Sequence, residues 1–128
     1  MNPSVTDRVK VSFEFFPPHS EPMRETLWKS IQRLKSFAPA FVSVTYGADG
    51  STRERTHDVV QRIVSETELT VAPHLTCVNA TRGEIDDIAH VYRDMGIRHI
   101  VALRGDPPAG TGRYEPMRGG YEIGRAHV

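Results

Sequence analysis

A strand pattern and a helix pattern alternate along this chain, and this alternation is what most constrains its fold. In residues 9–16 every second residue is apolar, so the apolar side chains share one face of a strand. Further apolar stretches at residues 41–46, 69–74 and 97–103 predict more strands. Successive strands lie about 30 residues apart, the size of a strand–helix–strand unit. This order predicts parallel strands joined by right-handed crossovers, as found in doubly wound sheets and in barrels.

Helix-start and helix-stop signals stand between these strands. Ser20 can cap a first helix, and residues 51–54 and 81–84 both match the capping-box pattern. Gly96 is placed to end the last helix in a left-handed conformation. The prolines and glycines that follow Gly105 predict a loop without regular structure.

Composition excludes several classes of protein. The formal net charge is zero, so no electrostatic field favours nucleic acid or an anionic membrane. No apolar run reaches the roughly 20 residues that span a bilayer, and residues 1–10 lack the apolar core of a secretory signal. The single cysteine, Cys77, excludes an internal disulfide. We therefore expect a cytoplasmic protein.

Polar residues stand where each predicted strand ends, which is where parallel α/β folds place their sites. In chain order they are Glu14, Thr45 with Tyr46, His74, and Arg104 with Gly105 and Asp106. Alternation predicts that the polar side chains share the face opposite the helices, with Ala102 and Arg104 on that face and Leu103 beneath the helices.

Each of these residues also has a structural interpretation. Glu14 can be an exposed charge, but its three phenylalanine neighbours favour a protonated carboxyl, which suits a general acid. Thr45 can simply favour a strand, and Tyr46 can be a core aromatic residue. His74 fits a site and a packing position equally well. Arg104 and Asp106 can form a salt bridge with each other.

Other reactive residue types give no motif. Cys77 is expected to be a buried thiol. The remaining histidines lack metal-ligand spacing, so no metal site is predicted. The glycine-rich segment lacks both phosphate-binding patterns.

Together, four strings around the strand ends closely resemble the 5,10-methylenetetrahydrofolate reductase family. They are SFEFFPP at residues 12–18, FVSVTYGA at 41–48, APHLTC at 72–77 and GIRHIVALRGDPP at 96–108. All four occur in the order and spacing of that family.

The resemblance implies a TIM-type (β/α)8 barrel that holds FAD, in which NADH or NADPH reduces the flavin and the flavin reduces methylenetetrahydrofolate. It implies that Glu14 is the general acid that opens the folate ring, and that Asp106 lies between flavin and folate. The family positions that contact FAD correspond here to Thr45, Tyr46, Ala48, His74, Arg104, Gly105 and Asp106. Glu14, Thr45 and Asp106 would also contact the substrates. A full-length member is expected to be a homo-oligomer.

The length of the chain limits this interpretation, because a complete barrel needs about 250 residues and eight strands. We expect residues 1–8 to be a leader and residues 9–112 to form about four strand–helix units of the barrel. Residues 113–121 are expected to be a truncated loop and residues 122–128 a non-native tail. This predicts an incomplete fragment that is inactive alone, binds FAD poorly and aggregates.

Two other functions are compatible with the same pattern. One is a non-catalytic α/β binding module, which would be a stable monomer with both sheet faces covered. The other is a different flavin barrel, such as a proline-dehydrogenase-like enzyme, which the Glu14 string disfavours.

Overall fold

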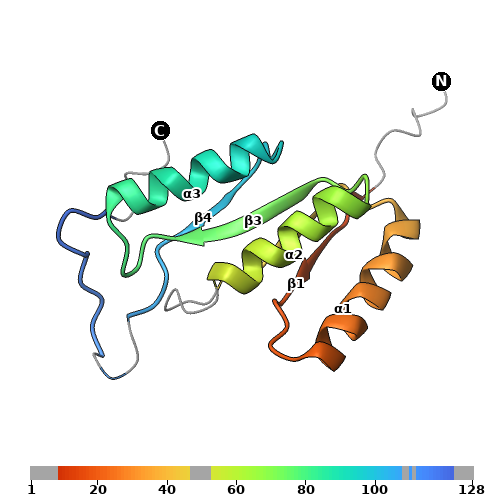
Figure 1. The fold of residues 1–128 in the computed structure, drawn as a ribbon, viewed down its shortest axis with the longest axis horizontal. Helices are drawn as coiled ribbons and strands as arrows, with labels where there is room; N and C mark the ends of the chain where they lie inside the picture. The colour runs from red at the N-terminus through yellow and green to blue at the C-terminus, as the bar shows by residue number, and fades with distance from the viewer. Residues whose placement is uncertain (1–8, 47–52, 108–109, 111, 123–128) are drawn as a thin grey trace.

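The computed structural model describes residues 9–46, 53–107, 110 and 112–122, and within them an α/β fold with a parallel sheet (Figure 1). The strands are β1 (Ser12–Phe15), β2 (Phe41–Val44), β3 (Val71–Thr76) and β4 (Val101–Leu103). The helices are α1 (Glu21–Leu34), the short 3-10 helix η1 (Lys35–Phe37), α2 (Arg53–Glu66) and α3 (Arg82–Asp94). The strands lie in the order β1-β2-β3-β4, and each adjacent pair is parallel. The predicted parallel α/β organisation is therefore confirmed.

The hydrophobic core lies between one face of this sheet and the helices. Phe15 from β1, Val42 and Val44 from β2 and Val71 from β3 belong to one buried cluster. Helix side chains complete that cluster, namely Ile31 of α1, Val59, Val60 and Ile63 of α2, and Tyr92 of α3. In Figure 1, α2 crosses in front of β1. Because all three α-helices contribute to the same cluster, the opposite face of the sheet is not covered by a helix in the described residues.

Helix α1 begins as predicted. The Ser20 side chain accepts a hydrogen bond from the Met23 amide at 3.4 Å, and proline occupies the first turn. Helix α3 begins with the predicted capping box, in which Thr81 and Glu84 bind each other's backbone amides. The other predicted capping box starts at residues 51–52, which lie outside the described residues.

Two strands, β3 and β4, begin later than the sequence pattern predicts, because the end of the preceding helix uses the predicted strand start. Gly96 has a φ of 88° and donates to the Arg93 carbonyl, while Ile97 donates to the Tyr92 carbonyl at 2.9 Å. This is a Schellman motif. It uses the amide of Ile97, the residue where the fourth strand was predicted to begin. Instead of spanning residues 97–103, β4 begins at Val101.

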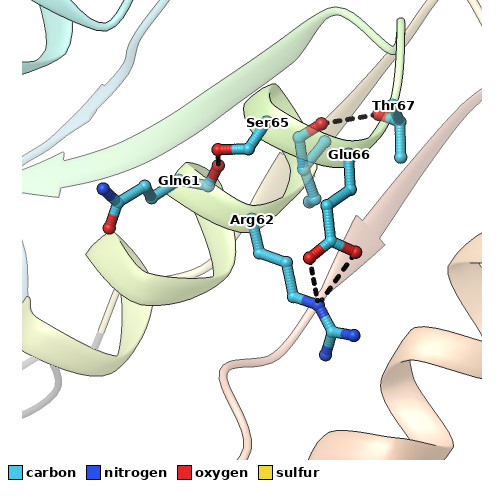
Figure 2. Close-up of polar contacts among 6 residues, drawn as sticks. Gln61, Arg62, Ser65, Glu66 and Thr67 are labelled. Atoms are coloured by element: carbon cyan, nitrogen blue, oxygen red, sulfur yellow. Dashed lines mark hydrogen bonds and ion pairs between the residues drawn. The ribbon is translucent and has the colours of Figure 1, made fainter.

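The end of α2 shifts β3 in the same way (Figure 2). The Thr67 hydroxyl donates to the Ile63 carbonyl at 2.7 Å and accepts from the Leu69 amide at 3.2 Å. As Figure 2 shows, Arg62 also pairs with Glu66 one turn later, at 3.3 Å. The third strand was predicted over residues 69–74, and β3 spans Val71–Thr76.

The sheet register corrects one prediction about the faces. His74 is paired with Val101 and Thr76 with Leu103, and paired residues of parallel strands point to the same side. Leu103 therefore lies on the His74 face, and Ala102 lies on the helix face. The sequence interpretation reversed these two residues, because it counted the alternation back from Arg104, which follows the end of β4.

None of the helices in the described part of the chain is long and apolar enough to span a membrane. After Leu103 the described residues form neither helix nor strand, as predicted.

Replacing Gly96 by alanine tests the turn at the end of α3. A Cβ at this position would meet no atom within 4 Å, so any cost comes from the positive φ alone. We expect Gly96→Ala to lower the free energy of unfolding by about 1–2 kcal/mol in urea titration.

Gly83→Ala is the matched control, since Gly83 lies in the first turn of α3 and its nearest neighbour would be 4.0 Å away. We expect this substitution to raise stability by about 0.4–1 kcal/mol. Equal effects of the two substitutions would contradict the left-handed turn.

Candidate functional site

The sheet face without helices carries an acid–base pair. Glu14 in β1 and His74 in β3 lie on two strands separated by β2, and Glu14 Oε1 is 3.2 Å from His74 Nε2. Glu14 is paired in the sheet with Ser43, which is paired with Ala72, so Glu14, Ser43 and the alternating His74 share this face. The prediction that strand-end polar residues converge is thus confirmed for Glu14 and His74.

The two partners of this pair differ in their environment. The His74 side chain is 10% exposed and that of Glu14 is 53% exposed. Burial lowers the pKa of His74 below its ordinary value, and the Glu14 carboxylate partly opposes that shift by favouring the imidazolium. Burial therefore favours the neutral imidazole of His74, and the neighbouring Glu14 reduces that preference.

The phenylalanines beside Glu14 do not enclose its carboxyl, contrary to the sequence interpretation. Phe15 is buried in the core on the helix side, Phe13 packs against that core, and Phe16 is 73% exposed. The physical reason is the alternation of the strand, which points Phe13 and Phe15 away from Glu14. Half exposure of Glu14 also means that it is accessible to a ligand on the open face.

Of the two predicted site residues at the end of β2, only Thr45 is on the open face by alternation. Its amide donates to the Phe15 carbonyl at 2.9 Å, which continues the pairing with β1. The Tyr46 side chain is buried and accepts a hydrogen bond from Arg53 of α2. Burial raises the pKa of Tyr46, with Arg53 opposing the shift, so its hydroxyl stays neutral. The alternative interpretation of Tyr46 as a core aromatic is confirmed.

Arg104, Gly105 and Asp106 follow β4 and leave the regular sheet. Arg104 and Asp106 are exposed, and Gly105 has a φ of 84°. Within the described residues Arg104 and Asp106 form no salt bridge with each other, so the alternative structural role of this pair is not supported. Instead, the Arg104 guanidinium lies 4.8 Å from the centre of the Tyr114 ring.

Sequence reasoning did not find two of the residues that order this rim. Arg53 donates to Tyr46 and, at 3.3 Å, to the Val78 carbonyl, so it joins the ends of β2 and β3. Tyr114 contacts Arg104 and also lies 3.6 Å from the Cys77 sulfur. Neither residue stands at a strand end, so the rule used to select candidates could not reach them. Ala48, a predicted cofactor contact, lies outside the described residues.

A cavity of about 360 Å³ lies away from the open face, between α2 and α3. Its lining includes Tyr46, His57 and Tyr92, and the His57 and Tyr92 rings stack at 5.8 Å. The cavity is therefore on the helix side of the sheet, not beside Glu14. Among the described residues no group of three or more side chains is arranged to hold a metal ion.

Replacing Glu14 by glutamine tests the acid–base pair. Without the carboxylate, nothing opposes the effect of burial, so we expect the pKa of His74 to fall further below about 6.5. An NMR titration of the histidine ring protons would measure this, with the His74 signal assigned from His74→Asn.

The pH dependence of the free energy of unfolding gives a second readout. The folded chain binds the His74 proton less tightly than the unfolded chain. The folded state therefore loses stability as pH falls through 6.5 toward the lower pKa of folded His74. Glu14→Gln should steepen that loss. Glu21→Gln is the control, because Glu21 lies at the exposed start of α1. A His74 pKa that is unchanged or raised in Glu14→Gln would contradict the contact.

The family model described as methylenetetrahydrofolate reductase matches residues 2–126. The 5,10-methylenetetrahydrofolate reductases of Salmonella typhimurium and Escherichia coli are 57% and 55% identical over 87% of this chain. A plant relative, methylenetetrahydrofolate reductase (NADH) 1 of Arabidopsis thaliana, is 38% identical over 92% of this chain.

The matches cover only part of each relative. This chain spans 38% of the length of the two bacterial proteins and 20% of the plant protein. Within that part, the family model and the relatives agree, and the similarity includes both strands that carry the acid–base pair. The chain belongs to the methylenetetrahydrofolate reductase family.

Proposed function

We propose that this chain supplies the N-terminal part of a flavoenzyme that reduces 5,10-methylenetetrahydrofolate to 5-methyltetrahydrofolate at the expense of NADH or NADPH. The observation that carries the proposal is the 3.2 Å contact between Glu14 and His74 on the open face of the sheet. The bacterial relatives carry the corresponding name, which supports the same folate substrate here. The reaction belongs to one-carbon metabolism and provides methyl groups for methionine synthesis, and we expect it in the cytoplasm.

The arrangement of strands supports a partial TIM-type barrel. The strands follow one another in sequence order, and all three α-helices pack on one side. A doubly wound sheet reverses its strand order and has helices on both faces, whereas a barrel keeps the order and has an outer ring of helices. In this interpretation the face with Glu14 and His74 is the inside of the barrel, and its strand ends form part of the mouth.

The residues of the open face fit a flavin. Leu103 is 45% exposed and shares the His74 face through the β3–β4 register, so it offers an apolar surface to a flat ring. Thr45 and His74 provide hydrogen-bonding groups beside it, and Arg104 offers an exposed cation. We propose that these residues, with Gly105 and Asp106, hold FAD, whose chemistry when bound is hydride transfer from the nicotinamide to the folate.

The buried Tyr46 side chain points toward the helices, so any contact with FAD would come from its backbone. The role of Ala48 stays a prediction from the family resemblance.

Glu14 is proposed to act as the general acid of the folate reaction. A carboxyl that is half exposed on the open face can reach a bound substrate, and it can donate its proton to the folate nitrogen whose release opens the five-membered ring. His74 Nε2 is close enough to return a proton to Glu14 Oε1. Asp106 is exposed after β4, where its negative charge would stabilise the iminium cation that forms on the folate.

The reductant is proposed to be NADH or NADPH. The plant relative is named as an NADH enzyme, which supports NADH. We also propose that the complete enzyme is a homo-oligomer, as the family resemblance implies.

The chain by itself is proposed to be inactive and to bind FAD weakly. Its open face exposes Leu103 together with Phe41, and both outer strands of the described sheet have an unpaired edge. We expect a flavin fluorescence titration to give weak binding, and light scattering to detect aggregates. Stoichiometric FAD on a monodisperse monomer would contradict this prediction.

A chimera tests the proposed activity. Residues 9–112 of this chain would replace the matching segment of the Salmonella relative, which is 57% identical. We expect the chimera to bind FAD, to reduce menadione with NADH, and to reduce methylenetetrahydrofolate. Loss of all three in a folded chimera would contradict the proposed function.

Glu14→Gln in the chimera tests the assignment of the acid. The folate reaction needs the proton and the menadione reaction does not, so we expect folate turnover to fall by about 10²–10⁴-fold while menadione turnover is retained. Glu21→Gln, which changes an exposed glutamate of α1, should retain both. Equal losses of the two activities in Glu14→Gln would show that Glu14 is not the acid.

A further inference from the structure

Residues 113–121, here called the strap, fold back onto the start of α3. The Arg82 amide donates to the Gly119 carbonyl at 3.0 Å, and Arg82 Nε donates to the Gly120 carbonyl at 3.2 Å. The Tyr121 hydroxyl donates to Asp86 at 2.5 Å. Three separate hydrogen bonds therefore hold one end of the strap against α3. The sequence predicted only a loop at these residues, without these contacts.

Gly120 shows how closely the strap lies on the protein. It is buried, and a Cβ at this position would stand 2.7 Å from the Ala80 carbonyl oxygen. Because that neighbour is backbone, it cannot move away without shifting the loop before α3. Only glycine is compatible with this contact.

The other end of the strap reaches the strand ends through Tyr114. Cys77 follows β3, Arg104 follows β4, and Tyr114 contacts both. The Cys77 thiol donates to the Arg104 carbonyl at 3.7 Å. A thiol has one proton, so the Tyr114 hydroxyl, 3.6 Å from the sulfur, is the donor of the second contact.

The contact favours a neutral tyrosine. Burial together with the Cys77 contact raises the pKa of Tyr114 to about 12, so the hydroxyl keeps the proton that it donates. The Arg104 guanidinium lies over the Tyr114 ring, with its central carbon Cζ 4.8 Å from the ring centre. The guanidinium also donates from Nε to the adjacent Gly105 carbonyl at 3.3 Å, so among these two contacts the Tyr114 ring is the non-local restraint.

We propose that Tyr114 is a positioning residue, which holds the Arg104 guanidinium at the carboxyl ends of β3 and β4 and covers the Cys77 thiol. Arg104 would then meet the anionic or electron-rich part of the flavin in one orientation instead of many. This inference rests on the proposed function, because Arg104 has its cofactor role only there. The part that concerns Cys77 is independent of any cofactor.

The experiment uses the full 128-residue chain with two readouts. Cys77 is the only cysteine, so its rate of reaction with a disulfide reagent such as DTNB reports one site. The second readout is the dissociation constant for FAD from flavin fluorescence, with the ligand in large excess because weak binding is expected. The variants are Tyr114→Ala, which removes ring and hydroxyl, and Tyr114→Phe, which removes the hydroxyl alone.

We expect Tyr114→Ala to raise the rate of Cys77 modification by about two- to tenfold and to weaken FAD binding by about two- to fivefold. Tyr114→Phe should raise the Cys77 rate by less and restore the FAD affinity, since the ring under Arg104 remains. Gly120→Ala keeps the Tyr114 side chain but displaces the strap from the Ala80 carbonyl, so it should also raise the rate of Cys77 modification.

The two readouts separate the possible failures. An unchanged Cys77 rate in Tyr114→Ala would overturn the inference. A raised rate with unchanged FAD affinity would overturn the positioning of Arg104, as would a Tyr114→Phe variant that binds FAD as poorly as Tyr114→Ala. If the unaltered chain showed no FAD binding at any concentration while the Cys77 rate responded as expected, the proposed flavin site would be wrong and the cover over Cys77 would stand.

Discussion

Burial of one face of the sheet under three helices is the interaction on which the rest of this structure depends. The β2 side chains Val42 and Val44 are at most 1% exposed, and they meet Ile31, Val60 and Ile63 of the helices in one cluster. Removing this apolar surface from water is the main stabilising contribution that the described residues offer. Since strand side chains alternate, burying one set commits the other set to the opposite face.

That commitment creates the candidate site. Glu14 and His74 belong to the set that the core does not use, and the parallel register brings them within 3.2 Å of each other. His74 is mostly buried by its neighbours while Glu14 remains accessible. An acid that can reach a ligand, next to a base that is partly shielded from water, is an arrangement suited to proton transfer. The loop after β4 adds Arg104 and Asp106 to the same end of the sheet, and the strap restrains Arg104 through Tyr114.

The differences between expectation and structure come mainly from helix ends. The sequence pattern predicted strands beginning at residues 69 and 97, but β3 begins at Val71 and β4 at Val101. Leu69 and Ile97, where the two strands were predicted to begin, instead donate to the ends of α2 and α3. Leu69 donates to the Thr67 hydroxyl, and Ile97 donates to the Tyr92 carbonyl. Apolar residues in a helix-ending motif resemble the start of a strand, so hydrophobicity alone could not separate them. The reversed faces of Ala102 and Leu103 have another cause, because the alternation was counted back from Arg104, which follows the end of β4.

The sequence alone determined the order of strands and helices, the caps at Ser20 and Thr81, the turn at Gly96, and the polar residues carried to the strand ends. These features depend on interactions within a few residues, which a local pattern can encode. Only the tertiary structure decided that Glu14 touches His74, that Tyr46 turns toward the helices, and that Tyr114 reaches Cys77 across 37 residues of chain. Such contacts depend on the register between strands and on which surfaces are buried together, and neither quantity is a property of any short segment.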